Sequence, residues 1–195
     1  GEGRIAPPFT IQPRFLCNNP VMGNLQITRA MVAITGLLAL CGCAADVAPV
    51  TEQPTMYLSM ANGGARLDPQ AAASMISLYR QNNGLGAVAV DPDLMKLAEQ
   101  QSQAMAARNK LDHDVKGPLA KRLNASGYPA TVAVENVSAG YHTMAEAFSG
   151  WRDSPPHKAN MLKNGVTNLG IAATYAPNTK YKVFWTLILA SSEKR

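Results

Sequence analysis

Three side chains suited to catalysis or metal binding, His113, Glu135 and His157, lie in separate segments of this chain. His157 follows Ser154 and two prolines, which fit the first turn of a helix because the N–H groups there have no intrahelical partner. We therefore expect Ser154 to cap a helix. The positive end of a helix disfavours an imidazolium, so His157 should be neutral, as a metal ligand or general base must be. The alternative is a histidine that only hydrogen-bonds to a neighbouring loop.

Glu135 lies inside the otherwise apolar run AVENVSAG, and a buried carboxylate needs a partner. That partner is either the backbone or a cation such as arginine, or else the two histidines, if His113 and His157 meet Glu135 in one cleft. Two neutral imidazoles and a carboxylate could hold Zn²⁺ or another divalent cation with one position left open. The chain has no HExxH pair, so residue spacing alone does not establish a metal site.

The elements that must position these residues follow from capping signals and hydrophobic periodicity. Helices are predicted from Asp68-Pro69 to the NNG at 82–84, from Asp91-Pro92 to Asn109, from Gly117-Pro118 to Gly127, and from a Thr143/Glu146 capping box through Trp151. Alternation predicts a strand over 130–140, and the β-rich runs 170–176 and 181–191 predict a terminal antiparallel hairpin. This order of elements favours an α+β sandwich over repeated βαβ units.

Composition limits the possible functions. The chain has 195 residues, 47% of them hydrophobic, which is enough for one packed domain. Its formal net charge is +5, but it contains no run of lysine and arginine of the kind that binds the phosphate backbone of a nucleic acid. We therefore exclude nucleic acid as a partner. All three cysteines (Cys17, Cys41 and Cys43) precede the predicted domain, so no disulfide framework holds it together.

The segment from Met22 onward reads as a bacterial lipoprotein signal peptide. Arg29 supplies its positive charge, residues 30–40 form an apolar run too short to span a bilayer, and Leu40-Cys41-Gly42-Cys43 resembles a lipobox. Cleavage there would leave a lipidated Cys43 at the N-terminus, and several acyl chains on one residue bind a membrane firmly. The alternative is a plain secretory signal peptide that is cleaved near Ala44 or Ala45.

These features predict four segments. Residues 1–21 are expected to be a non-native N-terminal extension, with translation starting at Met22 or Met31, and residues 22–42 the signal peptide. Residues 43–66 are small, polar and proline-bearing, as in a flexible tether, and residues 67–192 form the domain.

Three stretches resemble the bacterial branch of the CAP superfamily, named for cysteine-rich secretory proteins, antigen 5 and pathogenesis-related proteins. They are LYRQNNGLGAVAVDPDLMKLAEQQSQAMAARNKLDHD, ENVSAGYHTMAEAFSGWRDSPPHKANML and NLGIAATYAPNTKYKVFWTLILA. The similarity covers about Ala71 to Ala190, with the motifs in the order of the family. It implies a three-layer α-β-α sandwich with a central antiparallel sheet and a cleft lined by histidine and glutamate.

The resemblance also implies a set of site residues. His113 and His157 match the two family histidines, and Glu135 matches the glutamate of its EN motif. Eukaryotic members have a second glutamate where this chain has Asp153 or its neighbours, so that residue is missing or Asp153 replaces it. The frequent cleft neighbours and framework aromatics of the family are matched by Asn136, Ser154, Asn160, Trp151 and Trp185.

These observations together predict an extracytoplasmic, membrane-anchored lipoprotein, in the periplasm or at the cell surface, that is a binding or envelope-associated module more than an enzyme. Its partners are expected to be the membrane, through Cys43, and an envelope ligand or a lipid or sterol-like molecule. An apolar groove around GYHTMAEAF and the Met-bearing helices could take such a lipid. The alternative function is a metal-dependent, protease-like hydrolase that uses His113, Glu135 and His157.

Overall fold

The computed structural model describes residues 53–192. The expected extension, the signal peptide, Cys43 and the first part of the expected tether lie outside the described residues. Among those described, no helix combines the length and the apolar character that crossing a membrane requires.

A four-stranded sheet with the spatial order β1-β3-β4-β2 organises the domain. The long strands β2 (Ala130–Ala139) and β3 (Asn168–Ala176) both pair antiparallel with β4 (Lys182–Ser192), as the sequence predicted. The two-residue strand β1 (Ala89–Val90) pairs parallel with β3 and was not predicted, because two residues are too few to show alternation. The sheet is therefore mixed at one edge rather than purely antiparallel.

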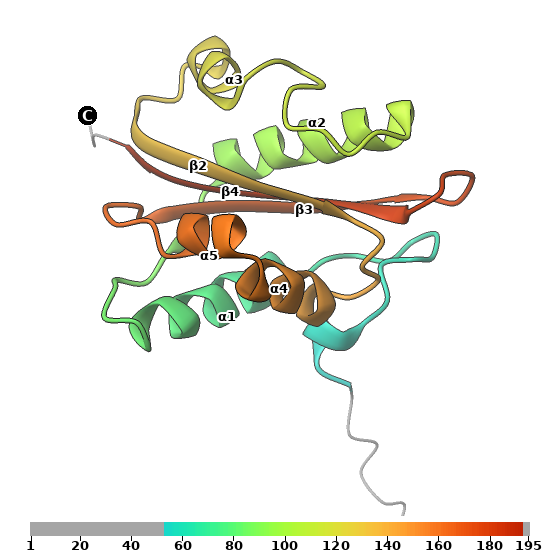
Figure 1. The fold of residues 1–195 in the computed structure, drawn as a ribbon, viewed down its shortest axis with the longest axis horizontal. Coiled ribbons are helices and arrows are strands. Elements are labelled where there is room, and N and C mark those ends of the chain that lie inside the picture. Colours follow the sequence, from blue (N-terminus) through green and yellow to red (C-terminus); the bar gives the residue numbers. More distant parts are fainter. Residues whose placement is uncertain (1–52, 193–195) are drawn as a thin grey trace, which may run out of the picture. The chain divides into compact units, whose positions relative to one another are not determined.

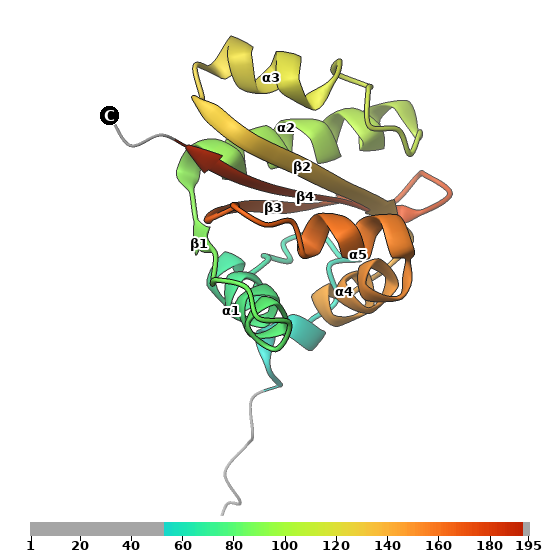
Figure 2. The same cartoon turned by 60° about the vertical axis from the view of Figure 1, so that its left-hand side comes forward.

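Helices cover both faces of this sheet (Figure 1). On one face lie α1 (Pro69–Gln81), α4 (Met144–Asp153) and α5 (Pro155–Met161), and on the other α2 (Pro92–Arg108) and α3 (Leu119–Ser126). The turned view in Figure 2 shows the same three layers. The expected α+β class with its α-β-α sandwich is confirmed.

The inner strand β4 holds the layers together because both of its faces are buried. Successive side chains of a strand point to opposite faces, so alternate residues enter different cores. Toward α1, α4 and α5 it directs Val183, Trp185, Leu187 and Leu189, and toward α2 and α3 it directs Phe184, Ile188 and Ala190.

Local sequence signals set the helix ends as predicted. The side chains of Asp68 and Asp91 accept hydrogen bonds from the first-turn N–H groups of α1 and α2, and Thr143 forms a capping box with Glu146 at α4. Gly127 ends α3 in the left-handed conformation (φ 74°), which costs glycine little. Each predicted helix therefore begins and ends close to where the sequence places it.

The helix α2 packs unusually close to the sheet at Gly170 of β3. A Cβ atom at Gly170 would collide with the backbone carbonyl of Leu94, so only glycine permits this approach. This contact fixes the start of α2 against the sheet.

Part of the expected tether, before Leu67, has ordered structure that packs on the domain. A 3₁₀ helix, η1 (Thr55–Tyr57), precedes it, and Met60 is 5% exposed within the core shared by α1 and α4. The Met60 N–H also donates to the His142 carbonyl at 2.7 Å. Burial of Met60 therefore outweighs the polar, proline-bearing composition of this segment, which packs on the core.

Candidate functional site

The candidate site lies at β2, the edge strand opposite β1 in the sheet. Glu135 and Asn136 are neighbours in β2, so their side chains point to opposite faces of the sheet. Glu135 meets the α2–α3 layer, and Asn136 meets α5. We refer to His113, Glu135, Asn136, His157 and Asn160 as the histidine site.

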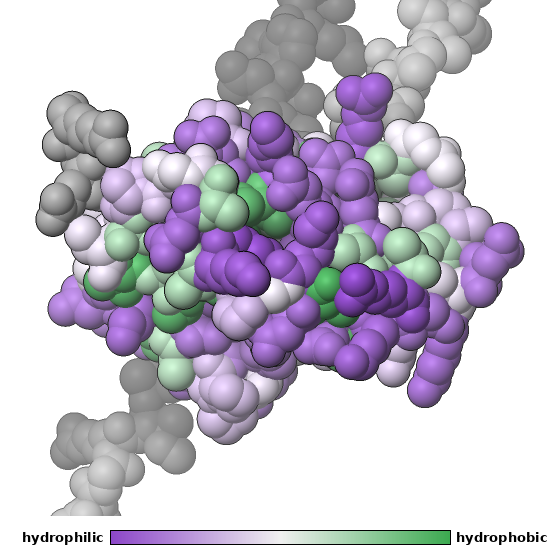
Figure 3. Space-filling view, turned by 90° about the horizontal axis from the view of Figure 1, so that it is seen from above, coloured by the Kyte–Doolittle hydropathy of each residue, from purple (hydrophilic) through white to green (hydrophobic). Residues whose placement is uncertain are grey.

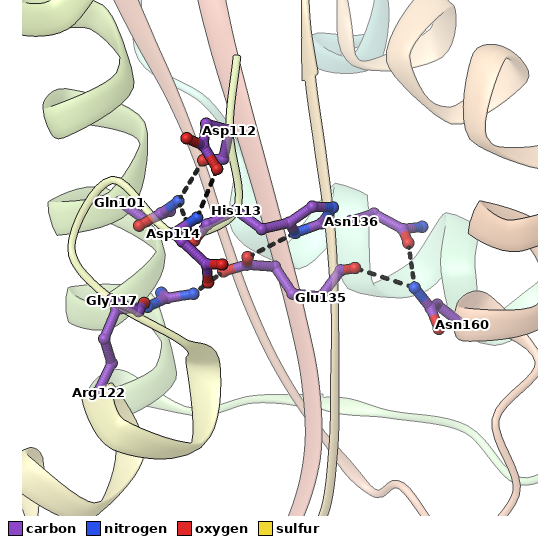
Figure 4. A network of polar contacts seen from close by, with 9 residues as sticks. All are labelled: Gln101, Asp112, His113, Asp114, Gly117, Arg122, Glu135, Asn136 and Asn160. Carbon is purple, nitrogen blue, oxygen red and sulfur yellow. Dashed lines mark hydrogen bonds and ion pairs between the residues drawn. The ribbon is translucent and has the colours of Figure 1, made fainter. Parts of the chain in front are cut away.

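Both carboxylate oxygens of Glu135 are engaged (Figure 4). Oε1 lies 2.9 Å from His113 Nδ1, and Oε2 accepts from Arg122 Nη2 at 2.5 Å. Glu135 is 6% exposed, and Arg122 also donates through Nε to the Gly117 carbonyl at 3.0 Å. The two partners that the sequence offered as alternatives for Glu135, an arginine and a histidine, therefore both contact it.

His113 is held by its loop and by Glu135. Gln101 of α2 donates through Nε2 to the carbonyls of Asp112 and His113, both at 2.9 Å, which fixes the loop backbone. The hydrogen bond with Glu135 raises the pKa of His113 above its ordinary value. When Nδ1–H donates to Glu135, Nε2 of the neutral ring is left with a free lone pair, and 54% of the side chain is exposed.

His157 enters the site from α5 on the other face of the sheet. Asn136 donates to the His157 carbonyl at 3.0 Å, and Asn160 donates to both the Glu135 carbonyl and Asn136 Oδ1 at 2.9 Å. These bonds tie the first turn of α5 to β2. Burial, and to a lesser extent the charge of nearby His113, lower the pKa of His157, so the ring is neutral near pH 7.

Two expected neighbours do not act as the sequence suggested. Asp153 pairs with Arg152 at 2.8 Å on the surface and makes no described contact with the histidine site, so it does not replace the second family glutamate. Ser154 occupies the N-cap position of α5 without a side-chain cap bond. Pro156 has no N–H at the second helical position, one of the two usual donors to a cap, and the N–H of His157 at the third is not used.

The donor set does not fit the expected His-Glu-His ligation of a metal. Among residues 53–192, no group of three or more histidine, cysteine or acidic side chains is placed to hold an ion. Glu135 is buried and each of its oxygens is already held by His113 or Arg122, so it is poorly placed to be a direct ligand. It fits a different role, that of a carboxylate that orients a histidine from behind and leaves Nε2 free. The two imidazoles are the remaining nitrogen ligands of the site.

Sequence reasoning missed Arg122 and Gln101. Arg122 lies among the predicted helical residues LAKRLNA, and only the rule that a buried carboxylate needs a cation pointed toward an arginine. In the sequence, Gln101 looks like a surface residue of α2, as its neighbours Glu99 and Gln100 do, but it is completely buried. No local pattern separates it from them.

The expected apolar groove at GYHTMAEAF is also not formed. Met144 is 2% exposed and belongs to the core, and the hollow at this segment is lined mainly by polar residues such as His142, Glu146 and Ser149. An apolar hollow of about 520 Å³ lies elsewhere, between the start of α2 and β3. Its apolar lining consists of Leu67, Val90, Pro92, Met95, Ile171, Ala172 and Ala173.

A mostly antiparallel sheet between two helical layers, with two histidines at its edge strand, defines a CAP-type domain. Residues 73–189 match the model of the cysteine-rich secretory protein (CAP) family, and the chain belongs to this family.

Known relatives agree with this assignment. The chain is 27% identical over 129 residues to the uncharacterized protein YkwD of Bacillus subtilis, covering 65% of this chain and 50% of YkwD. An extracellular protein containing an SCP domain from Bacillus anthracis is 26% identical, with a TM-score of 0.55, over 63% of this chain and 40% of that one. An outer surface protein from Borrelia burgdorferi shares the fold, with a TM-score of 0.58 at 16% identity over 64% of this chain and 92% of that one. The chain thus spans half the length or less of its two Bacillus relatives.

Proposed function

We propose that this CAP-domain protein is an extracytoplasmic binding module of the cell envelope, anchored to the membrane by lipid on Cys43. The lipobox-like Leu40-Cys41-Gly42-Cys43 supports the anchor, and the extracellular SCP-domain relative from Bacillus anthracis supports the location. Metabolic labelling with a fatty acid tests the anchor: the chain should incorporate the label, and Cys43→Ala should abolish it. Labelling that persists in Cys43→Ala would place the lipid elsewhere.

The engagement of both Glu135 oxygens is the observation that favours binding over hydrolysis. A general base needs a lone pair within reach of the proton it removes, and this carboxylate is buried, with one oxygen held by His113 and the other by Arg122. The groups free to meet a ligand are Nε2 of His113 and the ring of His157. We therefore assign recognition to the imidazole pair and a positioning role to Glu135.

A divalent cation is the simplest probe of the imidazole pair. If Zn²⁺ binds, His113 and His157 supply two nitrogens, water or a ligand group completes the shell, and the ion would polarise a bound oxygen. Residues 53–195 suit the measurement, because they hold all the described core and none of the three cysteines, which bind zinc themselves.

Calorimetric titration of Zn²⁺ into this domain should reveal one site. We expect His113→Ala and His157→Ala each to weaken binding at least tenfold. His142→Ala is the matched control, because His142 is the third histidine of the chain and is exposed at the start of α4. Glu135→Gln should weaken binding by about 10-fold to 100-fold, as loss of a carboxylate behind a histidine does. Equal affinity in all four variants would overturn the shared site.

A lipid ligand is the second candidate, and the apolar hollow between α2 and β3 favours it. The hollow has apolar walls and two charged lining residues, Lys96 and Glu99, so an acyl chain with its carboxylate near Lys96 matches it. Displacement of a fluorescent fatty acid measures this binding directly. Ala172→Trp should block it, and Ala139→Trp, on another strand, should not.

A further inference from the structure

A second hollow, of about 410 Å³, lies between α2 and α3 and is lined by cationic residues. Lys96 comes from α2, Lys116 from the α2–α3 loop and Lys121 from α3, and Asp93 is the only acidic residue of the lining. Three lysines against one aspartate leave a formal charge of +2, without counting Arg122. Figure 3 looks onto this side of the domain, where the surface is largely hydrophilic.

These lysine charges are not neutralised within the domain. None of Lys96, Lys116 and Lys121 takes part in an ion pair among the residues that the structure describes. Three lysines around one hollow with a single aspartate among them repel one another, and a bound anion would relieve that repulsion.

Arg122 adds a buried donor to the same hollow. Its side chain is 7% exposed and is fixed by Glu135 and by the Gly117 carbonyl, yet Nη1 is buried and has no hydrogen-bond partner among the described residues. A buried N–H group without an acceptor is unfavourable, and native structures rarely keep one. An anion oxygen that reached this nitrogen from the hollow would supply the missing acceptor.

We propose that this hollow, the α2–α3 pocket, binds a phosphate group. Phosphate carries several strong acceptor oxygens and more than one negative charge, so it can meet donors from three segments at once, whereas a carboxylate offers two oxygens in one plane. The lysines act as point charges, and Arg122 supplies a fixed planar donor. The pocket is separate from the histidine site, and the proposal does not depend on the function proposed for that site.

The test is an amide NMR titration of the full chain with inorganic phosphate, at constant low ionic strength maintained with chloride. We expect shifts confined to the first half of α2 and to residues 116–126. Lys116→Gln/Lys121→Gln should raise the dissociation constant at least tenfold. Lys163→Gln is the matched control, since Lys163 is exposed beyond α5 and its loss removes the same charge elsewhere. The amide spectra also show that each variant is folded.

Absent shifts, shifts scattered over all surface lysines, or equal affinity in Lys116→Gln/Lys121→Gln and Lys163→Gln would overturn the pocket. A parallel titration with glycerophosphoglycerol, a deacylated lipid headgroup, identifies the source of the phosphate. Tighter binding of this diester than of inorganic phosphate would assign the pocket to a lipid headgroup. Binding of inorganic phosphate alone would assign it to a free phosphate ion.

Discussion

Two arginines are buried in this domain, and their surroundings differ completely. Arg80, 1% exposed, donates to backbone carbonyls alone: Gly86 through Nε, Met161 and Lys163 through Nη1, and Val166 through Nη2. Arg122, 8% exposed, donates to the carboxylate of Glu135 and keeps one nitrogen unpaired.

The difference separates a structural arginine from one that belongs to the binding chemistry. Arg80 on α1 closes the turn after α5 by donating to three of its carbonyls, and burial lowers the pKa of its guanidinium. Arg122 balances the charge of a carboxylate that in turn orients His113. The contacts of Arg80 stabilise the fold. Those of Arg122 set the electrostatics of the histidine site and of the α2–α3 pocket.

Replacing Arg80 should cause the largest loss of stability. Arg80→Met leaves the carbonyls of Met161, Lys163 and Val166 without donors inside the fold, and each unsatisfied buried group costs about 1–3 kcal/mol. We expect the free energy of unfolding to fall by about 3–5 kcal/mol in urea titrations. A loss below about 1 kcal/mol would mean that water reaches these carbonyls, and the structural assignment would fail.

Replacing Arg122 should cost less and should depend on Glu135. Arg122→Met leaves a buried carboxylate with only His113 as partner, and we expect a loss of about 2–3 kcal/mol, since removing one partner strands the other. Adding Glu135→Gln should restore at least half of that loss, because no charge is then left unpaired.

The control for this coupling is the pair Arg80→Met and Glu135→Gln, which share no contact in the structure. Their effects on unfolding should add to within about 0.5 kcal/mol. Additive behaviour of Arg122→Met and Glu135→Gln as well would show that the ion pair contributes nothing to stability.

The pKa values of the two histidines of the site should be shifted in opposite directions from the ordinary histidine pKa. The pKa of His113 is raised by Glu135, so its contribution to stability is complete below the unfolded pKa of 6.5 and is lost as pH rises through the folded pKa. The pKa of His157 is lowered by burial, so stability is lost as pH falls below 6.5 toward its folded pKa.

NMR titration of the imidazole protons measures both values in one experiment. Glu135→Gln should lower the pKa of His113 and move that of His157 much less, and Arg80→Gln should shift neither directly. An unshifted His113 in Glu135→Gln would mean that the 2.9 Å contact with Glu135 does not persist in solution.

The smallest effect is expected at the start of α5. Ser154→Ala should change the free energy of unfolding by less than about 0.5 kcal/mol, because Ser154 makes no cap bond and α5 is held by Asn136 at one end and Arg80 at the other. Thr143→Ala, which removes a real cap of α4, should cost about 1 kcal/mol under the same conditions. Equal losses would restore the capping role that the sequence suggested for Ser154.

Much of the fold follows from local sequence signals. Asp68, Asp91 and Thr143 each stand at the start of a helix that the structure contains, because a cap and the residues after it are adjacent in the chain. The terminal hairpin was equally readable from its two β-rich runs separated by PNTK. Met60 was not, since a single apolar residue in a polar segment gives no sign that a core will receive it.

The site was predictable only in part. Sequence indicated that Glu135 needs a cation, and the family resemblance connected it to His113, but neither could show that Arg122 occupies its second oxygen. That contact depends on how α3 lies over β2, which is a matter of packing between layers rather than of local pattern. The same holds for Arg80, three of whose four partners lie more than eighty positions away in the chain.

His113 and His157 come from opposite layers, and each is hydrogen-bonded to β2, His113 through Glu135 and the His157 carbonyl through Asn136. A ligand bound to both rings would therefore link the two helical layers across β2. The strand could then separate from the sheet only after the ligand dissociates. Ligand binding should therefore slow amide hydrogen exchange along the whole of β2, including residues that do not contact the ligand.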